Sequence, residues 1–363
     1  MEKISIIMPT YNSEKYVGRA LKSVIEQTYP MIELIIIDGD SKDRTMDIIN
    51  NHREHISIVV SEPDDGIYDA FNKGILCATG DIIYFLNSDD YLIHSIIIEE
   101  MMACFDKQHS IVYGDISLIY ENDQESRTYG REFSLDDLSK GYVPPHQAFF
   151  VRKQLFEIYG LFDKKYKIAG DFERAICFFK NEVGKIKYIN KNVAAFRVGG
   201  ISSNYVTRAV GLLEKEKIIK ESLHIDRPLA EVEIQNNALY RQWLEMILVE
   251  KVGITRRLHQ LTCKNVAVFG SLETADYLIQ DLSLEGFVTG FIIDNFNSSP
   301  FYKFNIPIIK EADIDQHLEH IDCVIVSIES AIGYDITARL KARYGHKIAI
   351  FWWKEFFNNG KIA

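Results

Sequence analysis

The stretch SEPDDGIYDAFNKGILCATGDIIYFLNSDD, residues 61–90, joins a predicted helix over 67–77 to a predicted apolar strand over 82–86. The strand runs directly into Asp89 and Asp90. Adjacent carboxylates are unfavourable in an apolar core, but they suit a hard divalent cation, which requires several oxygen ligands at one point. The alternative is that they cap and begin the next helix, which is a common use of Asp. We favour the metal site because another predicted strand also ends in an acid.

Short apolar runs alternate with amphipathic segments through the first third of the chain. Their spacing predicts βαβ units and a largely parallel sheet, and beyond Asp90 the pattern indicates a more antiparallel region. We expect Ser13 to cap the first helix. The predicted strands of this part span residues 4–8, 33–37, 56–60, 111–120, 127–133, 148–151 and 185–193, and further predicted helices span 13–27, 43–52 and 171–180.

The pattern divides the chain into three parts. Residues 1–206 contain the strands and helices above. Residues 207–261 lack strand signals and are rich in Glu, Lys, Leu and Ile, so we expect a helical linker. A smaller α/β unit follows at 262–363. The predicted fold class is therefore α/β, with a mixed, mostly parallel central sheet flanked by helices and a second, smaller α/β domain.

The composition argues against several kinds of partner. The chain has 41 Lys and Arg against 52 Asp and Glu, a formal net charge of −11. This balance argues against nucleic acid and against broad adhesion to anionic lipid. The five cysteines are scattered without CxxC spacing, as is typical of reduced core residues. No signal-peptide pattern and no apolar run of ~20 residues is present, so we expect a cytoplasmic protein without a transmembrane segment.

A group of polar and aromatic residues follows the first two predicted strands. Asp38 follows the second strand, and Pro9, Thr10, Tyr11 and Asn12 follow the first. Ligands of open α/β sheets bind beyond the C-terminal ends of the strands, so these residues should border one crevice. The carboxylate of Asp38 suits hydrogen bonds from a base or ribose, and Tyr11 suits stacking on a base. The alternatives are an acid that starts a turn and an aromatic residue at the rim.

Four sequence blocks together resemble a known family. PTYN, IDGDSKDRT, EPDDGIYDAFNKG and LNSDD occur in the order and spacing of bacterial family 2 glycosyltransferases of the GT-A fold, over residues 1 to about 205. The resemblance implies that Pro9, Tyr11 and Asp38 contact the nucleotide, usually uridine. Further residues implied to line the nucleotide-sugar pocket are Asp65 and Lys73.

The same resemblance assigns the metal and the general base. Asp89 would face the ribose or the sugar, and Asp90 would bind Mn²⁺ or Mg²⁺ that bridges the diphosphate. The family's base lies in an acidic block that opens a helix, here AGDFE, residues 169–173, where Asp171 matches. Such a carboxylate accepts the proton that an acceptor hydroxyl loses as it attacks the anomeric carbon. The alternative for Asp171 is a helix N-cap.

Two more blocks resemble parts of this family. His146, in PHQ, would lie near the diphosphate or the acceptor, and a structural histidine is the alternative. Arg197 begins RVGGIS, residues 197–202, a loop that would close over the bound donor with Gly199 and Gly200 as its hinge. An ordinary mobile connection is the alternative.

The C-terminal unit begins like a Rossmann βαβ unit with NVAVFGSLETADYL, residues 265–278, and Asp294 ends the next strand, where a ribose-binding acid would lie. The GxGxxG pattern fails because Leu272 and Ala275 occupy the later glycine positions. We expect a Rossmann-like domain that serves assembly or acceptor positioning rather than cofactor chemistry. The aromatic segment 351–357 predicts packing against the sheet, with a subunit or membrane-surface contact as the alternative.

These observations predict a metal-dependent, inverting glycosyltransferase. It would move a sugar from a nucleotide-sugar donor, a UDP-sugar, to a glycan, glycoprotein or lipid-linked acceptor, with Mn²⁺ or Mg²⁺ as cofactor. Enzymes of this kind build surface polysaccharides or protein glycans on the cytoplasmic side, where a peripheral contact with the membrane and a homo-oligomer formed through the C-terminal domain are further expectations. The alternatives are a non-catalytic sugar-nucleotide-binding or scaffold protein, and an oxidoreductase that uses the C-terminal unit.

Overall fold

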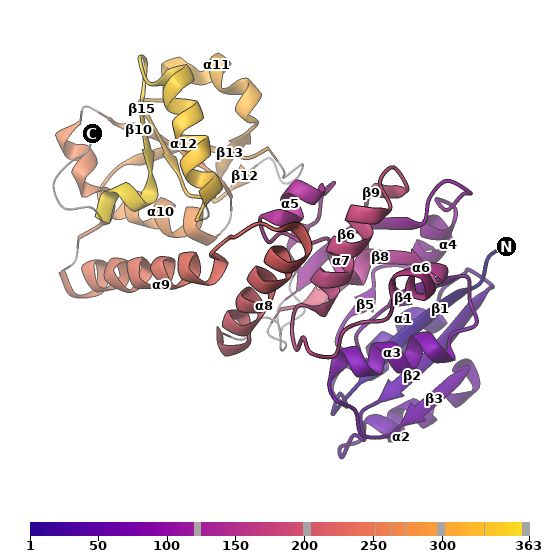
Figure 1. The fold of residues 1–363 in the computed structure, drawn as a ribbon. Coiled ribbons are helices and arrows are strands. Elements are labelled where there is room, and N and C mark those ends of the chain that lie inside the picture. Colours follow the sequence, from indigo (N-terminus) through magenta and orange to yellow (C-terminus); the bar gives the residue numbers. More distant parts are fainter. Residues whose placement is uncertain are drawn as a thin grey trace. The chain divides into compact units, whose positions relative to one another are not determined.

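Two compact units, Met1–Ala230 and Glu231–Ala363, make up the chain (Figure 1). Each unit has its own sheet and its own hydrophobic core. Residues 207–261, for which the sequence predicts a separate linker, are divided between the two units. The computed structural model describes residues 1–119, 125–198, 205–250, 252–261, 263–271, 273–295, 302–329 and 331–357.

One sheet runs through the first unit in the order β3-β2-β1-β4-β8-β6-β9-β5, with β7 paired to β6. Its strands are β1 (Ile4–Thr10), β2 (Ile32–Asp38), β3 (Ile58–Ser61), β4 (Ile82–Phe85), β5 (Tyr91–Leu92), β6 (Ile111–Ile119), β7 (Glu125–Tyr129), β8 (Phe149–Arg152) and β9 (Ile186–Arg197). The first four strands pair in parallel, β8 lies antiparallel between β4 and β6, and β9 is parallel to β6. This mixed, mostly parallel sheet confirms the predicted GT-A-like α/β fold.

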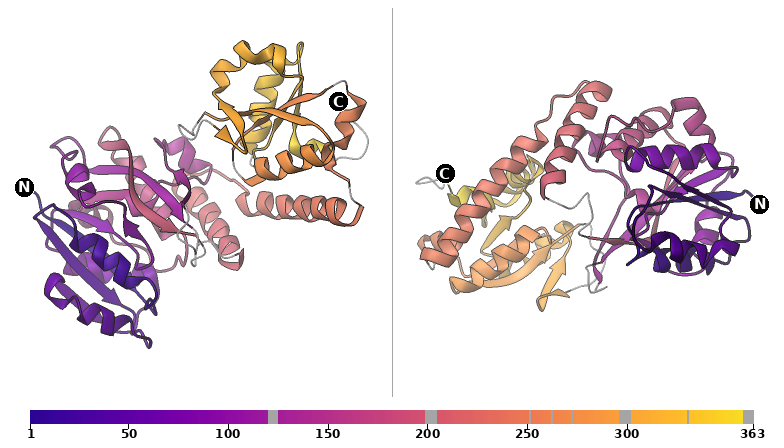
Figure 2. Two further views of the ribbon diagram at one scale, coloured as in Figure 1. Left: turned by 180° about the vertical axis from the view of Figure 1, so that it is seen from behind. Right: turned by 90° about the horizontal axis from the view of Figure 1, so that it is seen from below.

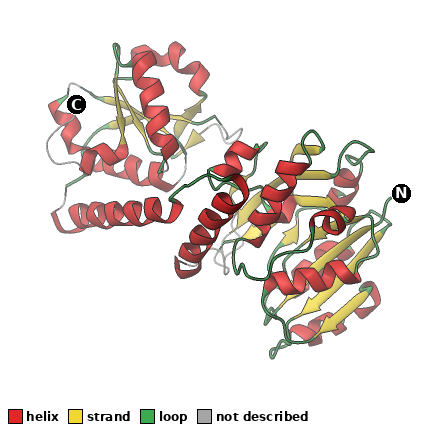
Figure 3. Cartoon of the chain, viewed as in Figure 1, coloured by secondary structure: helices red, strands yellow, loops and turns green. Residues whose placement is uncertain are grey.

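Helices cover both faces of this sheet (Figure 3). They are α1 (Val17–Ile25), α2 (Thr45–Asn50) and α4 (Ile97–Met102) on one face, and α3 (Ile67–Cys77), α5 (Leu135–Ser139), α6 (Gln154–Tyr159), α7 (Gly170–Asn181) and α8 (Tyr205–Leu223) on the other. Side chains alternate along a strand, so Ile6 and Met8 pack against the face that α1, α2 and α4 cover, whereas Ile7 packs against the opposite face. The sheet is therefore buried on both faces.

The first helix begins later than the sequence predicts. Its N-cap residue is Tyr16, which makes no side-chain cap hydrogen bond, so the prediction that Ser13 caps the helix is wrong. Ser13 Oγ instead donates to the carbonyl of Tyr11 at 3.2 Å and lies 2.7 Å from Ser88 Oγ. The hydroxyl is engaged there because the loop after β1 passes beside the loop after β4.

The parallel register brings the C-terminal ends of four strands to one edge. Thr10 lies opposite Asp38, and Asp38 lies opposite Ser61. On the other side of β1, Ile7 lies opposite Phe85, so β4 ends at the same edge. The residues that follow these strands therefore share the edge at which open α/β sheets bind ligands.

The second unit contains a smaller sheet in the order β12-β13-β11-β10-β14-β15. Its elements include α9 (Leu229–Glu245), which begins at the boundary, β10 (Asn265–Phe269), α10 (Glu273–Leu284), β11 (Val288–Ile293), β12 (Tyr302–Lys303), β13 (Ile306–Ile309), β14 (Cys323–Val326), α12 (Ala331–Tyr344), β15 (Ala349–Trp352) and η8 (Trp353–Phe357). All strands except β12 pair in parallel. Helices α10 and α12 pack into different cores of this unit (Figure 2).

The aromatic C-terminal segment packs inside the second unit. Trp353, Phe356 and Phe357 are buried in the same core as Trp243 of α9. This confirms the packing interpretation for these three side chains. Across the described ranges, none of the helices is long and apolar enough to cross a membrane.

The buried carboxylate of Glu33 generates a prediction about stability. It accepts hydrogen bonds from Lys3 Nζ at 2.8 Å, Ser5 Oγ at 2.6 Å and the Thr79 amide at 2.8 Å. Burial alone raises the pKa of Glu33, but these hydrogen bonds lower it to about 2. A lowered folded-state pKa adds stability above the unfolded-state value, and this stability is lost as the pH falls toward 2.

We therefore expect Glu33→Gln to destabilise the protein at pH 7 by about 2–3 kcal/mol. The difference from the wild type should shrink as the pH falls from about 4.5 toward 2, because the wild-type carboxylate is then protonated. Urea unfolding at several pH values measures this. Glu26→Gln, at an exposed position on the same unit, is the matched control and should change little. Equal effects of the two substitutions at pH 7 would contradict the prediction.

Candidate active site

Asp38 is fully buried at the end of β2. Its carboxylate accepts hydrogen bonds from Thr10 Oγ1 at 3.1 Å, from the Ser41 amide at 3.0 Å and hydroxyl at 2.5 Å, and from Ser61 Oγ at 2.7 Å. The acid therefore ties together the ends of β1, β2 and β3. This agrees with the alternative interpretation, in which Asp38 starts a turn. A contact from Asp38 to a nucleotide stays a prediction.

Tyr11 lies at the rim of this edge, with 64% of its surface exposed. The chain turns sharply beside it, because Asn12 has a φ of +47° and accepts a hydrogen bond from the Lys42 amide at 2.9 Å. A Cβ atom on Gly39 would lie 3.3 Å from the Tyr11 ring and 2.7 Å from Asp64 Oδ2. Gly39 thus brings Asp64, which sequence reasoning missed, beside the exposed ring.

Lys73 and Asp65 have different partners. Lys73 Nζ lies 2.8 Å from the Glu62 carboxylate and donates to the Pro63 carbonyl at 3.0 Å, and the hydrogen bond with Glu62 raises the pKa of Lys73. Asp65 is exposed and forms an ion pair with Lys164 at 3.2 Å. The two lysines hold the acidic loop before α3, and the direct role of Asp65 and Lys73 toward a donor stays a prediction.

Asp89 and Asp90 follow β4, with Asp90 buried and Asp89 half-buried. Asp90 is 1% exposed, and its Oδ1 accepts a hydrogen bond from the Arg197 amide at 3.0 Å. Burial and the charge of Asp89 raise the pKa of Asp90 well above its usual range. Burial also raises the pKa of Asp89, against the opposing charges of Arg197 and His146. The pair therefore needs positive charge to be stable in its ionised form.

A divalent cation fits this pair. Asp90 Oδ2 is buried and accepts no hydrogen bond from the described part of the chain. Within that same part, no group of three His, Cys, Asp or Glu side chains converges on one point. Mg²⁺ is commonly held by one or two carboxylates together with substrate phosphates, so two acids suffice if the donor supplies further oxygens.

A cavity of about 170 Å³ lies against the two acids. Most of its lining residues were not predicted from the sequence. The cationic and aromatic residues of the segment 15–19 could have indicated a binding surface there. The Arg197 guanidinium lies 4.4 Å from the centre of the Tyr16 ring, and the hinge residues Gly199 and Gly200 lie outside the described residues. The cavity is lined by Lys15, Tyr16, Arg19, Asp89, Asp90, Tyr91 and Arg197.

His146 connects the loop after β4 with Asp171. It lies on η2 (His146–Ala148), with Nε2 3.2 Å from Asn87 Nδ2 and Nδ1 3.5 Å from Asp171 Oδ2. If the Asn87 amide donates to Nε2, Nδ1 carries the proton that faces Asp171. One imidazole thereby links Asp171 with Asn87, in the loop that leads to Asp89 and Asp90.

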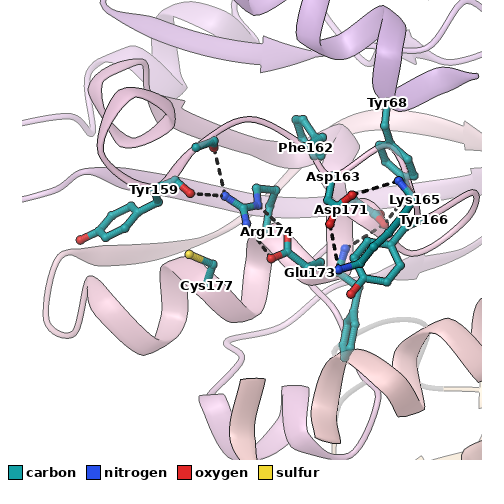
Figure 4. A network of polar contacts seen from close by, with 12 residues as sticks. Tyr68, Tyr159, Phe162, Asp163, Lys165, Tyr166, Asp171, Glu173, Arg174 and Cys177 are labelled. Carbon is teal, nitrogen blue, oxygen red and sulfur yellow. Dashed lines mark hydrogen bonds and ion pairs between the residues drawn. The ribbon is translucent and has the colours of Figure 1, made fainter. Parts of the chain in front are cut away.

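Asp171 lies in the first turn of α7, and its side chain is 25% exposed. Tyr68 Oη, which sequence reasoning missed, donates to Asp171 Oδ1 at 3.2 Å and to the Ile168 carbonyl at 2.6 Å (Figure 4). Burial raises the pKa of Asp171, but the hydrogen bond and charge of His146 and the charge of Lys215 outweigh it and lower the pKa. The carboxylate is therefore ionised at neutral pH.

Helix α7 is anchored immediately after this carboxylate. Arg174 pairs with Glu173 and donates to the carbonyl of Tyr159 (Figure 4). The ion pair measures 2.5 Å, and Arg174 donates to the carbonyls of Tyr159 at 2.7 Å and Gly160 at 3.0 Å. These contacts tie the first turns of α7 to the end of α6. The helix that bears Asp171 is thus held by charge-assisted hydrogen bonds, which are stronger than neutral ones.

In the second unit, side chains of the chain itself bind the groups that would contact a dinucleotide in a Rossmann domain. Asp294 accepts a hydrogen bond from Ser271 Oγ. The Glu329 carboxylate accepts from Tyr240 Oη and Thr274 Oγ1, both at 2.7 Å, at the first turn of α10. That turn is where a Rossmann unit holds pyrophosphate. Leu272 lies outside the described residues.

Comparison with known proteins identifies the family of the chain. Residues 5–170 match the family described as Glycosyl transferase family 2. A PGL/p-HBAD biosynthesis glycosyltransferase of Mycobacterium tuberculosis is 33% identical over 211 residues, which are 56% of this chain and 80% of the relative. An uncharacterized glycosyltransferase of Nostoc sp. is 28% identical over 231 residues, 59% of this chain and 70% of the relative.

Solved structures also resemble part of the chain. Staphylococcus aureus TarS residues 1–349, in complex with UDP-GlcNAc, has a TM-score of 0.48 at 21% identity and covers 61% of this chain and 71% of that one. The chain spans 43% of the longer TarS structure, with a TM-score of 0.47 at 22% identity.

The link between His146 and Asp171 predicts a measurable change in acidity. His146→Ala removes the main group that lowers the pKa of Asp171, so we expect that pKa to rise. The carboxyl-carbon chemical shift of Asp171, followed by NMR across the pH range, measures it. His109→Ala is the control, because His109 contacts Asp106 and not Asp171. An unchanged Asp171 pKa in His146→Ala would show that the imidazole does not act on the carboxylate.

Proposed function

This chain belongs to glycosyl transferase family 2, and from that premise we propose that it is an inverting, metal-dependent enzyme that uses Asp171 as its general base. The chain is a glycosyltransferase that uses a nucleotide-sugar donor. The observation that supports the proposal most is the bridge from Asn87 through His146 to Asp171. This contact links Asp171 to the loop that carries Asp89 and Asp90, where we propose that the donor diphosphate is held.

Asp171 suits the role of base for three reasons. Its lowered pKa keeps it ionised, its side chain is partly exposed, and Tyr68 and His146 hold both of its oxygens. A carboxylate placed within hydrogen-bond reach of an acceptor hydroxyl takes up the proton as the oxygen attacks the anomeric carbon. One such displacement inverts the anomeric centre, so an α-linked donor gives a β-linked product.

The proposed metal ligand is Asp90, with Asp89 facing the ribose or sugar of the donor. Bound there, Mn²⁺ or Mg²⁺ would act as a Lewis acid and stabilise the charge that gathers on the leaving diphosphate. The chain's own contribution is to present two adjacent carboxylates, one buried and one half-buried, at the wall of one cavity. Arg197, whose amide binds Asp90, and the cationic lining of the 170 Å³ cavity add positive charge next to them.

For the donor we propose a UDP-sugar, bound along the ends of β1 and β2. Tyr11 is exposed beside Gly39 and Asp64, which suits stacking of a base against its ring. Pro9, Thr10, Asn12 and Asp38 form the adjoining strand ends, and Asp65 and Lys73 the next loop. The acceptor is proposed to be a glycan, glycoprotein or lipid-linked saccharide, in line with the biosynthetic role that the mycobacterial relative is named for.

We assign the second unit, a Rossmann-like domain, to assembly or acceptor positioning. Its Glu329 carboxylate lies beside the first turn of α10 and would repel a pyrophosphate there. This observation argues against a dinucleotide cofactor. A homo-oligomer formed through this unit and a peripheral membrane contact at the cytoplasmic face remain parts of the proposal.

The roles of the two carboxylates can be tested with matched variants. Asp171→Asn should lower the rate of nucleoside diphosphate release at least a hundredfold, because the base is lost. The assay screens a panel of nucleotide sugars with Mn²⁺ and acceptor saccharides. Asp163→Asn, eight residues before the proposed base and paired with Lys165, is the control and should retain most activity. Full turnover in Asp171→Asn would refute its assignment.

Removal of the metal provides an independent prediction. Chelation with EDTA should abolish nucleoside diphosphate release, and added Mn²⁺ should restore it. In isothermal titration with Mn²⁺ and UDP present, Asp90→Asn should lose metal binding while Asp171→Asn keeps it. Activity that persists in EDTA, or Mn²⁺ binding that survives in Asp90→Asn, would refute the metal assignment.

A further inference from the structure

A glutamate on α8 binds the loop that leads into the proposed base. Glu214 Oε1 accepts a hydrogen bond from the Lys167 amide at 2.7 Å, and Oε2 accepts from the amides of Ile168 at 2.9 Å and Ala169 at 2.8 Å. Asp171 follows two residues later. One carboxylate therefore satisfies three consecutive backbone donors at the N-terminal end of α7, where the helix dipole also favours a negative charge.

The same loop is clamped from its other side. Tyr68 Oη donates to the carbonyl of Ile168 at 2.6 Å, so the peptide groups around Ile168 are held by α3 and by α8. Helix α8 approaches closely at Gly211, where a Cβ atom would lie 2.9 Å from Ile168 Cγ2. A loop fixed from both sides gives the Asp171 side chain a defined starting direction.

We propose that Glu214 is a positioning residue for glycosyl transfer, which holds residues 167–169 so that Asp171 faces the acceptor. The proposal rests on the proposed function, in which Asp171 is the general base. Glu214 lies on α8, beyond the segment 5–170 that matches the family, and Asp171 lies one residue past the end of that segment. The helix that orients the proposed base is therefore not part of the matched segment.

Substitutions at Glu214 test the positioning role. Glu214→Ala should lower kcat about tenfold to a hundredfold, since small displacements of a catalytic group cost that much, and should leave the donor KM unchanged. Glu214→Gln keeps one acceptor oxygen and should fall between the wild type and Glu214→Ala. Glu216→Gln, on the same helix and bound to the Ala230 amide, is the matched control and should retain kcat. Unchanged kcat in Glu214→Ala would overturn the proposal.

Hydrogen exchange supplies a readout that does not depend on activity. The amides of residues 167–169 should exchange faster in Glu214→Ala, whereas protection elsewhere in the unit should be preserved. If Asp171→Asn retains full turnover, the proposed function fails whatever Glu214 does. If Asp171→Asn is inactive but Glu214→Ala has wild-type kcat and protection, only the positioning role fails.

Discussion

The loss of hydration at two adjacent carboxylates is the constraint on which the site depends. Asp90 is buried and Asp89 half-buried just beyond the buried strand β4, so burial raises the pKa of both, and the charge of Asp89 raises that of Asp90 further. The surrounding chain supplies partial compensation through the Arg197 amide and guanidinium and through His146. Each of these groups comes from a distant segment, so the sheet must be assembled before the pair is tolerated.

Much of the first unit is predictable because its signals are local. The helix over 67–77 has the predicted bounds, and the strands of the parallel half differ from the predicted ranges by one or two residues at most of their ends. Apolar runs and helical periodicity record burial on one or both faces, and the acids at the strand ends stand out against them. The placement of Asp38, Asp89 and Asp90 at one edge follows from parallel pairing.

The remaining features depend on contacts between distant segments. Ser13 fails as a cap because its hydroxyl meets Ser88, and Asp64 lies beside Tyr11 because Gly39 lets the loops approach. No local pattern indicates that Glu214 binds the loop before α7, since a Glu on a polar helix is ordinary. The sequence also does not indicate that the first unit extends past residue 206. It does so because α8 packs into the core of that unit, where Ile218 and Ile219 are fully buried.

The position of α8 has a consequence for exchanging parts between enzymes of this kind. A chimaera joined at the end of the matched segment, residue 170, would separate the loop of residues 167–169 from the proposed base Asp171 and from the helix whose Glu214 binds that loop. A junction placed after Leu223, where α8 ends, would transfer the sheet, the base and its support as one body. The modular unit of this glycosyltransferase is thus longer than the stretch by which its family is identified.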